Sequence, residues 1–215
     1  MRKNLTEIVF ILDRSGSMHG MERDTIGGFN SMIKKQKKQD GEAFVSTVLF
    51  DDECEVLHNR VPLDKIRPMT EEQYYVRGCT ALLDAIGGSI RHIANVHKYA
   101  RKEDVPEKTI FVITTDGMEN ASHKYSSDRV KKMIEKEKEK YGWEFIFLGA
   151  NIDAVETAAE IGISADRAVN YHCDSKGVQL NFEVVAETIA DYRENEVLCP
   201  QFLSRIDDDY KSRRK

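Results

Sequence analysis

The stretch "IVFILDRSGSMHG", residues 8–20, joins a short apolar run to a polar turn. The run is rich in Ile, Val and Phe, which is typical of a buried strand. It ends at Asp13, and Ser15 and Ser17 follow at alternate positions. Asp and Ser are common in turns and helix caps, so a strand that leads into a capped helix is one interpretation. The other interpretation is that these residues form half of a metal site. The rest of the chain is needed to choose between the two interpretations.

Short apolar runs alternate with longer amphipathic segments along the chain. The runs at 7–12, 108–115 and 143–151 are almost continuously apolar, as expected for parallel strands covered on both faces. In the longer segments apolar residues recur three and four positions apart, which predicts helices. Strands are predicted over 7–12, 43–50, 54–63, 108–115, 143–151 and 167–171, and helices over 21–33, 81–100, 127–142, 153–162 and 177–194.

The order of these elements predicts the fold class. The strands at 43–50 and 54–63 are separated by three residues, which favours an antiparallel hairpin. Elsewhere helices connect the strands, which is typical of a parallel sheet. We therefore predict a doubly wound α/β fold, with a mostly parallel central sheet, one antiparallel edge strand and helices on both faces. Gly27 and Gly28 weaken the first helical pattern, and we expect them to let that helix lie close to the sheet.

The length of the chain fits one domain. Its 215 residues contain no internal repeat, no low-complexity segment and no linker rich in Pro or Gly. We predict a single domain over residues 1–195. Residues 196–215 end in the polar run "DDDYKSRRK", and we predict that they form a partly disordered C-terminal tail.

Composition argues against several classes of partner. The net charge is −5 and the charges are interspersed, which disfavours nucleic-acid binding. No apolar stretch approaches the roughly 18 residues of a membrane span, and the N-terminal run does not have the pattern of a signal peptide. Cys54, Cys79, Cys173 and Cys199 are scattered, so we expect reduced, mostly buried thiols. The prediction is a cytoplasmic protein with neither nucleic acid nor membrane as its partner.

Polar side chains follow the predicted strands at the edge where α/β proteins bind ligands. The first strand delivers Asp13, Ser15 and Ser17, and the strand in "FVITTDG" delivers Asp116. Thr80 precedes a long helix in "RGCTALLDAI". Each motif alone is an ordinary turn or cap, but their convergence at one sheet edge favours a shared site. Two carboxylates and three hydroxyls form an all-oxygen set, which suits a hard cation such as Mg²⁺ or Mn²⁺.

The charge of this set predicts an open coordination position. Two carboxylates can at most neutralise a divalent ion, and hydroxyl ligands leave it more electrophilic than further carboxylates would. If one or both aspartates do not bind the ion directly but hydrogen-bond to the water or hydroxyl ligands, the ion keeps a net positive charge at that open position. Such an ion favours a carboxylate from another molecule.

In type and order these residues resemble the metal-ion-dependent adhesion site (MIDAS) of von Willebrand factor A (VWA) domains, which is Asp-x-Ser-x-Ser, a distant Thr and a distant Asp. The resemblance spans about residues 5–192, and "DRSGSM", "GCTALLDAI", "TTDGMENAS" and "FIFLGANIDA" are similar to bacterial stand-alone, cytoplasmic members. It implies a complete MIDAS formed by Asp13, Ser15, Ser17, Thr80 and Asp116, in which the serines ligate directly and Thr80 and Asp116 ligate directly or through water. The expected ion is Mg²⁺, with Mn²⁺ or Ca²⁺ as alternatives.

Three functions are compatible with such a site. The resemblance implies a non-enzymatic, metal-dependent protein–protein interaction module, in which an acidic side chain of a partner protein completes the coordination of the ion. The alternative is a metal-dependent hydrolase of the phosphoesterase type. Against it, the sequence offers no assignable general base and no His partner for Ser15 or Ser17. The third is a structural subunit whose ion only stabilises its loops.

Other acidic residues near these motifs have two interpretations each. Glu119 and Asn120 either lie on the rim and select partners or begin a solvated loop. Asp84 either binds the loops of the site or favours the dipole of its own helix. Residues 51–53 either hold Ca²⁺ or form a hairpin turn, which is the simpler explanation.

Overall fold

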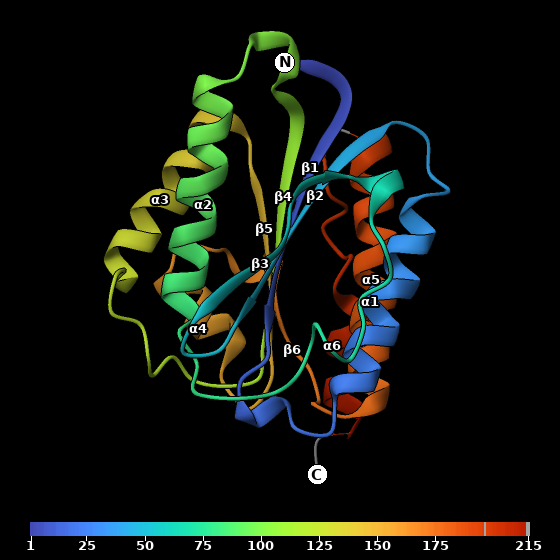
Figure 1. Cartoon of the computed structure of the whole chain (residues 1–215). Coiled ribbons are helices and arrows are strands. Elements are labelled where there is room, and N and C mark those ends of the chain that lie inside the picture. The colour runs from blue at the N-terminus through green and yellow to red at the C-terminus, as the bar shows by residue number, and fades with distance from the viewer. Residues whose placement is uncertain (196, 214–215) are drawn as a thin grey trace.

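A twisted sheet runs through the middle of the molecule, with helices on both of its faces (Figure 1). The structure is a computed structural model and describes residues 1–195 and 197–213. Its strands are β1 (Arg2–Asp13), β2 (Glu42–Phe50), β3 (Cys54–Pro62), β4 (Pro106–Thr115), β5 (Glu144–Gly149) and β6 (Ala168–Asn170). Its helices are α1 (Glu22–Gln36), α2 (Leu82–Tyr99), α3 (Ser127–Tyr141), α4 (Ala154–Glu160), α5 (Ser175–Glu194) and α6 (Ser204–Arg213).

The strand order across the sheet is β3-β2-β1-β4-β5-β6. All neighbours pair in parallel except β3, which pairs antiparallel with β2 at the edge. Figure 1 shows α2, α3 and α4 on one face of the sheet and α1 and α5 on the other. The structure confirms the predicted doubly wound α/β fold with one antiparallel edge strand.

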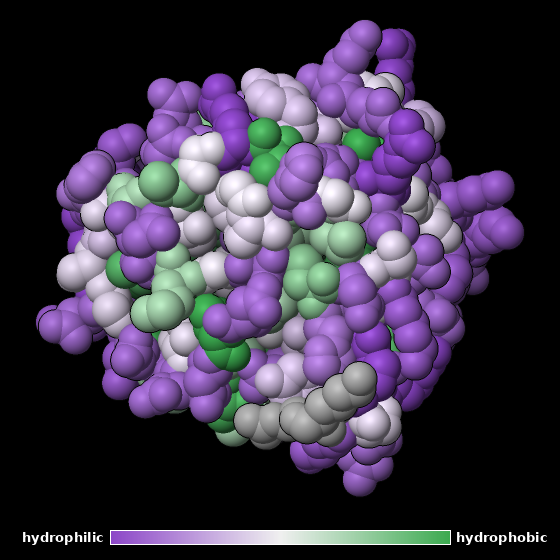
Figure 2. Space-filling view, turned by 90° about the horizontal axis from the view of Figure 1, so that it is seen from below, coloured by the Kyte–Doolittle hydropathy of each residue, from purple (hydrophilic) through white to green (hydrophobic). Residues whose placement is uncertain are grey.

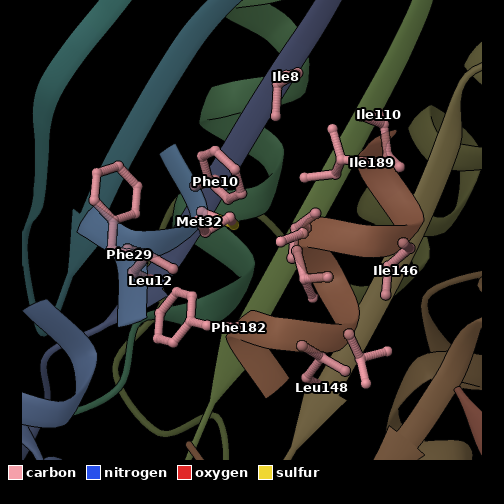
Figure 3. Close-up of a cluster of buried hydrophobic side chains, with 14 of the residues drawn as sticks. Ile8, Phe10, Leu12, Phe29, Met32, Ile110, Ile146, Leu148, Phe182 and Ile189 are labelled. Carbon is pink, nitrogen blue, oxygen red and sulfur yellow. The ribbon is translucent and has the colours of Figure 1, made fainter. Parts of the chain in front are cut away.

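Two apolar layers hold the sheet between its helices. Alternate residues of β1 belong to opposite layers, so the strand is buried on both sides. In the layer of Figure 3, Phe10 of β1 packs edge to face against Phe29 of α1, with ring centroids 5.5 Å apart. In the other layer, Phe111 stacks on both Trp143 and Phe145. This burial explains why the central strands are almost continuously apolar in sequence.

Helices α1 and α5 pack together at a point where α1 has no side chain. A Cβ built on Gly28 would lie 2.2 Å from Cδ2 of Phe182, whereas one built on Gly27 would have no described atom within 4 Å apart from its chain neighbours and its own helix backbone. This differs from the predicted role of the glycines, because Gly28 makes room for α5 and not for the sheet.

The C-terminal segment contains a helix that its polar composition does not suggest. Helix α6 contacts α5 and β6, and Leu198, Leu203 and Ile206 belong to the same buried layer as Phe10. Arg205 adds ion pairs to two carboxylates of α5. Residues 204–213 are therefore helical, which the sequence analysis did not predict, and Ile206 of the helix with Leu198 and Leu203 before it anchors this segment. The partial disorder of the tail stays a prediction. Residues 196, 214 and 215 lie outside the described residues, and the domain boundary at 195 stays a prediction.

The structure also bears on the cysteine thiols and on the search for a membrane-spanning helix. The cysteines are free, as predicted, but Cys54, Cys79 and Cys199 are exposed and Cys173 is half-buried, so the expectation of mostly buried thiols is wrong. Within the described residues, no helix combines the length and the apolar character needed to cross a membrane.

Gly28→Ala is expected to lower the free energy of unfolding by about 1–3 kcal/mol, because the added methyl group would displace the Phe182 ring from the core. Gly27→Ala is the matched control. Its methyl group would face open space, so stability should stay the same or rise by up to about 1 kcal/mol. Urea unfolding of both variants measures the difference, and equal midpoints would contradict this description of the packing.

Candidate metal site

The candidate site lies where the two central strands end. β1 and β4 are neighbours in the sheet, and the chain leaves them toward opposite faces, to α1 and to α3. In doubly wound sheets such a point forms a crevice at the carboxyl edge of the strands. This edge is the lower end of the molecule in Figure 1 and faces the viewer in Figure 2, where the surface is mostly hydrophilic with separate hydrophobic patches.

Asp13 is buried at the end of β1 and connects several parts of the site. Its Oδ1 accepts a hydrogen bond from the backbone N–H of Ser15 at 2.7 Å. Its Oδ2 accepts hydrogen bonds from the Thr115 hydroxyl at 2.7 Å and from the backbone N–H of Asp116 at 3.2 Å. The Tyr74 hydroxyl donates to the Asp13 carbonyl at 2.5 Å. Because both carboxylate oxygens are engaged, Asp13 holds the loops after β1 and β4 against each other.

Three hydroxyl groups converge beside this carboxylate. The side-chain oxygens of Ser15 and Ser17 lie 3.1 Å apart, at a short 3₁₀ turn over Gly16–Met18. Thr80 comes from the segment before α2, yet a Cβ built on Gly117 would lie 3.2 Å from Thr80 Oγ1 and 3.4 Å from Ser17 Oγ. The absence of a side chain at Gly117 therefore leaves both hydroxyls facing one small space.

Asp116 supplies the second carboxylate of the site. The side-chain amide of Asn151, at the end of β5, donates to Asp116 Oδ1. The other oxygen, Oδ2, is buried and has no hydrogen-bond partner among the described residues. Burial raises the pKa of Asp116 and the charge of Asp13 adds to the rise, while contacts with Cys173 and Asn151 oppose it. An unpartnered buried carboxylate oxygen is unfavourable, so this atom favours a donor or a cation.

This set of atoms fits a hard divalent cation. Its donors are all oxygens, which Mg²⁺ and Mn²⁺ prefer. A cation beside Asp116 would give Oδ2 a partner and would offset the charges of two neighbouring carboxylates. In the part of the chain that the structure describes, no group of three or more His, Cys, Asp or Glu side chains could hold a metal ion.

The structure brings the five predicted side chains to one place and adds others that the sequence analysis did not identify. Thr115 and Tyr74 both hydrogen-bond to Asp13. A hydroxyl at the end of the apolar run "FVITT" was an available signal for Thr115. Tyr74 lies in an irregular segment with no pattern of its own, so the sequence gives no comparable signal for it.

The loop after β4 is fastened to the start of α2. Glu119 Oε2 accepts a hydrogen bond from the backbone N–H of Leu83 at 2.8 Å, and Asn120 Oδ1 accepts one from that of Thr80 at 2.9 Å. Asp84 accepts hydrogen bonds from three successive backbone N–H groups over 123–125. Asp84 therefore binds the loops, one of its two predicted roles. Glu119 and Asn120 brace the site, which neither interpretation of these residues anticipated.

A cluster of ion pairs, centred on the buried Arg14 and Asp51, supports the β1 loop. The Nε atoms of Arg14 and Arg77 both donate to Asp51 Oδ2, at 2.7 Å and 2.8 Å. Arg14 is fully buried and also donates to Glu55 at 2.7 Å. Burial acts to raise the pKa of Asp51, but hydrogen bonds from both arginines and from the Glu53 backbone bring it below its ordinary value. This pairing favours a hairpin turn over a Ca²⁺ site at residues 51–53.

Comparisons with known proteins define the fold. No family model matches the sequence, and no curated protein matches it. The structure is similar to the von Willebrand factor domain of the type V pili tip protein Mfa5 from Porphyromonas gingivalis, with a TM-score of 0.64 and 10% identity, over 90% of this chain and 98% of that one. It is also similar to proximal thread matrix protein 1 from the mussel byssus, solved with a zinc-occupied MIDAS motif, with a TM-score of 0.58 and 16% identity.

A third similar structure is the von Willebrand factor type A protein from Catenulispora acidiphila, with a TM-score of 0.55 and 13% identity, over 87% of this chain and 42% of that one. The match to the mussel protein covers 88% of this chain and 47% of that one. This chain therefore corresponds to less than half of those two longer chains. At these identities the similarity concerns the fold, which is that of a VWA domain.

Asp51→Asn is expected to lower the free energy of unfolding by about 3–5 kcal/mol at neutral pH, because Arg14 would stay buried after losing a charged partner. Since the folded-state pKa of Asp51 is lowered, its contribution is present above pH 3.8 and is lost as the pH falls through that lowered pKa. Urea unfolding over a pH series tests both statements.

Glu53→Gln is the control for Asp51→Asn. Glu53 is an exposed partner of Arg77, at 3.2 Å, and its replacement should change stability by at most about 1 kcal/mol. If the two variants were equally stable at pH 7, the buried cluster would not have the assigned role.

Asp116→Asn is expected to raise the stability of the metal-free protein by about 1–3 kcal/mol at pH 7, because it removes a buried charge with an unpartnered oxygen. The raised pKa of Asp116 means that the unmodified protein loses stability as the pH rises above 3.8 through the folded-state pKa. The difference should therefore shrink in acid. Thermal unfolding in EDTA measures it, and a variant less stable than the unmodified protein at pH 7 would refute this assignment.

Proposed function

We propose that this protein is a non-enzymatic interaction module that binds a divalent cation at the carboxyl edge of its sheet and, through that cation, an acidic side chain of a partner protein. The observation that carries the proposal is the unpartnered, buried Asp116 Oδ2 beside converging hydroxyls from two other loops. The VWA fold supports it, since the similar structures include a pilus tip domain and a byssal matrix protein.

The proposed ligands come from three loops. The hydroxyls of Ser15 and Ser17 would bind the ion directly, and Thr80 and Asp116 would bind it directly or through water. Asp13 has both oxygens in hydrogen bonds, so it would act mainly by positioning the serine loop and any ordered water. Mg²⁺ is the proposed ion because every donor is a hard oxygen, and Mn²⁺ or Ca²⁺ are the alternatives.

The charge of the site supports an acidic partner. With Asp13 held in hydrogen bonds to the protein, a divalent ion would keep part of its charge at an open position. A carboxylate there would form a charge-assisted contact in a partly desolvated place, which is typical of an interface hot spot. Met118 lies two residues from Asp116 and is 73% exposed, so the partner surface around the acidic residue would contact an apolar side chain.

The alternative function, a metal-dependent hydrolase, has weaker support. Ser15 and Ser17 hydrogen-bond to each other, and among the described residues neither bonds to a histidine that could activate its hydroxyl. Turnover of a phosphate ester with Mg²⁺ or Mn²⁺, lost in Ser15→Ala, would favour the hydrolase. The assignment to bacterial stand-alone, cytoplasmic members of the family rests on the quoted sequence motifs and is part of this proposal.

Isothermal titration of the metal-free protein with Mg²⁺ or Mn²⁺, with acetate present to complete the coordination, is expected to show saturable binding near one equivalent. Asp116→Ala should weaken that binding at least tenfold, since it removes the unpartnered oxygen. Asp52→Ala is the matched control, because Asp52 is an exposed aspartate in the neighbouring hairpin.

Equal loss of binding in Asp52→Ala and Asp116→Ala would indicate that the ion binds at the hairpin and would contradict the proposed site. Binding of neither ion, with and without acetate, would remove the metal from the proposed function.

A further inference from the structure

A small pocket lies between the sheet and helices α1 and α5, next to Asp13 of the candidate metal site. Its volume is about 20 Å³, and its lining includes Leu12, Asp13, Thr25, Asn181 and Phe182. Figure 3 shows Leu12 and Phe182 in this apolar layer. One water molecule needs roughly 10–15 Å³ on the same scale, so the cavity has room for one.

Polar atoms without protein partners line this cavity. Thr25 and Asn181 are each 3% exposed. Both amide atoms of Asn181, Oδ1 and Nδ2, have no hydrogen-bond partner among the described residues, whereas the Thr25 hydroxyl interacts with the Tyr74 hydroxyl. A side-chain amide offers two donors and two acceptor sites, and leaving them unpaired in an apolar layer is strongly unfavourable. The Asn181 amide therefore requires a partner that the described side chains do not supply.

The two residues belong to different helices. Asn181 lies on the buried face of α5, where Val178 and Val185 are apolar neighbours on the same face. Thr25 lies in the first turn of α1, directly after the loop that carries Ser15 and Ser17. A group that hydrogen-bonds to both Thr25 and Asn181 would therefore connect α5 to the start of α1.

Thr25 is also linked through Tyr74 to Asp13, at the end of β1. The Tyr74 hydroxyl donates to the Asp13 carbonyl at 2.5 Å. Burial raises the pKa of Tyr74, and the nearby Thr25 hydroxyl partly opposes that rise. The Thr25 hydroxyl thus interacts with the group that holds Asp13, and its oxygen can still accept a hydrogen bond from a further donor.

We propose that this cavity is a binding site for one ordered water molecule, which hydrogen-bonds to Thr25 Oγ1 and to the side-chain amide of Asn181. The water joins α1 to α5 behind the candidate metal site. Asn181 determines that the pocket holds water, because its amide needs hydrogen-bond partners that an apolar group could not provide. This inference does not depend on the metal, because every group that it uses belongs to the metal-free protein.

A double-mutant cycle tests the bridge. Thr25→Val and Asn181→Leu each replace a polar group by an apolar one of similar shape and remove one side of the proposed bridge. Each single variant should raise the unfolding equilibrium constant about tenfold, whereas the double variant should stay within about threefold of the unmodified protein. If the effect of the double variant equals the product of the two single effects, the bridge does not exist.

Thr188→Val provides the matched control. Thr188 is also buried in α5, but its hydroxyl donates to the Val184 carbonyl at 2.8 Å. Its effect should multiply with that of Asn181→Leu, because the two side chains share no partner.

A crystal structure of the unmodified protein, at a resolution that shows ordered solvent, tests the proposal without variants. We expect one solvent peak about 2.7–3.2 Å from both Thr25 Oγ1 and an amide atom of Asn181. An empty cavity, or a direct hydrogen bond between Thr25 and Asn181, would overturn the proposal.

Discussion

The hydrogen bonds of the buried Asp13 carboxylate join the two central strands where their loops diverge. One oxygen binds the start of the serine loop, and the other binds Thr115 and the backbone of Asp116. Parallel strands bring their carboxyl ends together, but they do not by themselves fix the loops that follow. Asp13 supplies that constraint, because a buried carboxylate is stable only when its oxygens accept enough hydrogen bonds. The placement of the hydroxyls and of Asp116 depends on it.

The charges around this edge are balanced unequally. Beneath the serine loop, Asp51 is fully buried with two guanidinium partners. Asp116 is equally buried, but its partners are neutral: the Asn151 amide donates to Oδ1, the Cys173 thiol lies nearby, and no cationic side chain among the described residues pairs with it. Both carboxylates are shielded from water, yet the pKa of Asp51 is lowered and that of Asp116 is raised. The difference comes from their partners and not from their exposure. The imbalance is the physical reason for placing a cation at Asp116.

The fold was predictable because its signals are local and repeated. Continuous apolar runs indicated the central strands, and the short connection at 51–53 indicated the antiparallel edge. The candidate site was partly predictable, because Asp13, Thr80 and Asp116 each follow or precede an element whose end lies at the same sheet edge. The packing of Gly28 against Phe182 and the pairing of Arg14 with Asp51 were not, since they join positions far apart in sequence. Helix α6 was missed because its few apolar residues lie in a strongly polar segment, and no local pattern shows that α5 offers them a surface.

The most direct test of the central claim is the position of a bound ion. A crystal of the metal-free protein soaked in Mn²⁺ gives an anomalous signal that needs no assumption about ligands. The account predicts one strong peak about 2.0–2.3 Å from the Ser15 and Ser17 hydroxyls, next to Thr80 and Asp116. A peak at the hairpin of residues 51–53, or no peak while Asp116 Oδ2 hydrogen-bonds to a protein donor, would contradict it.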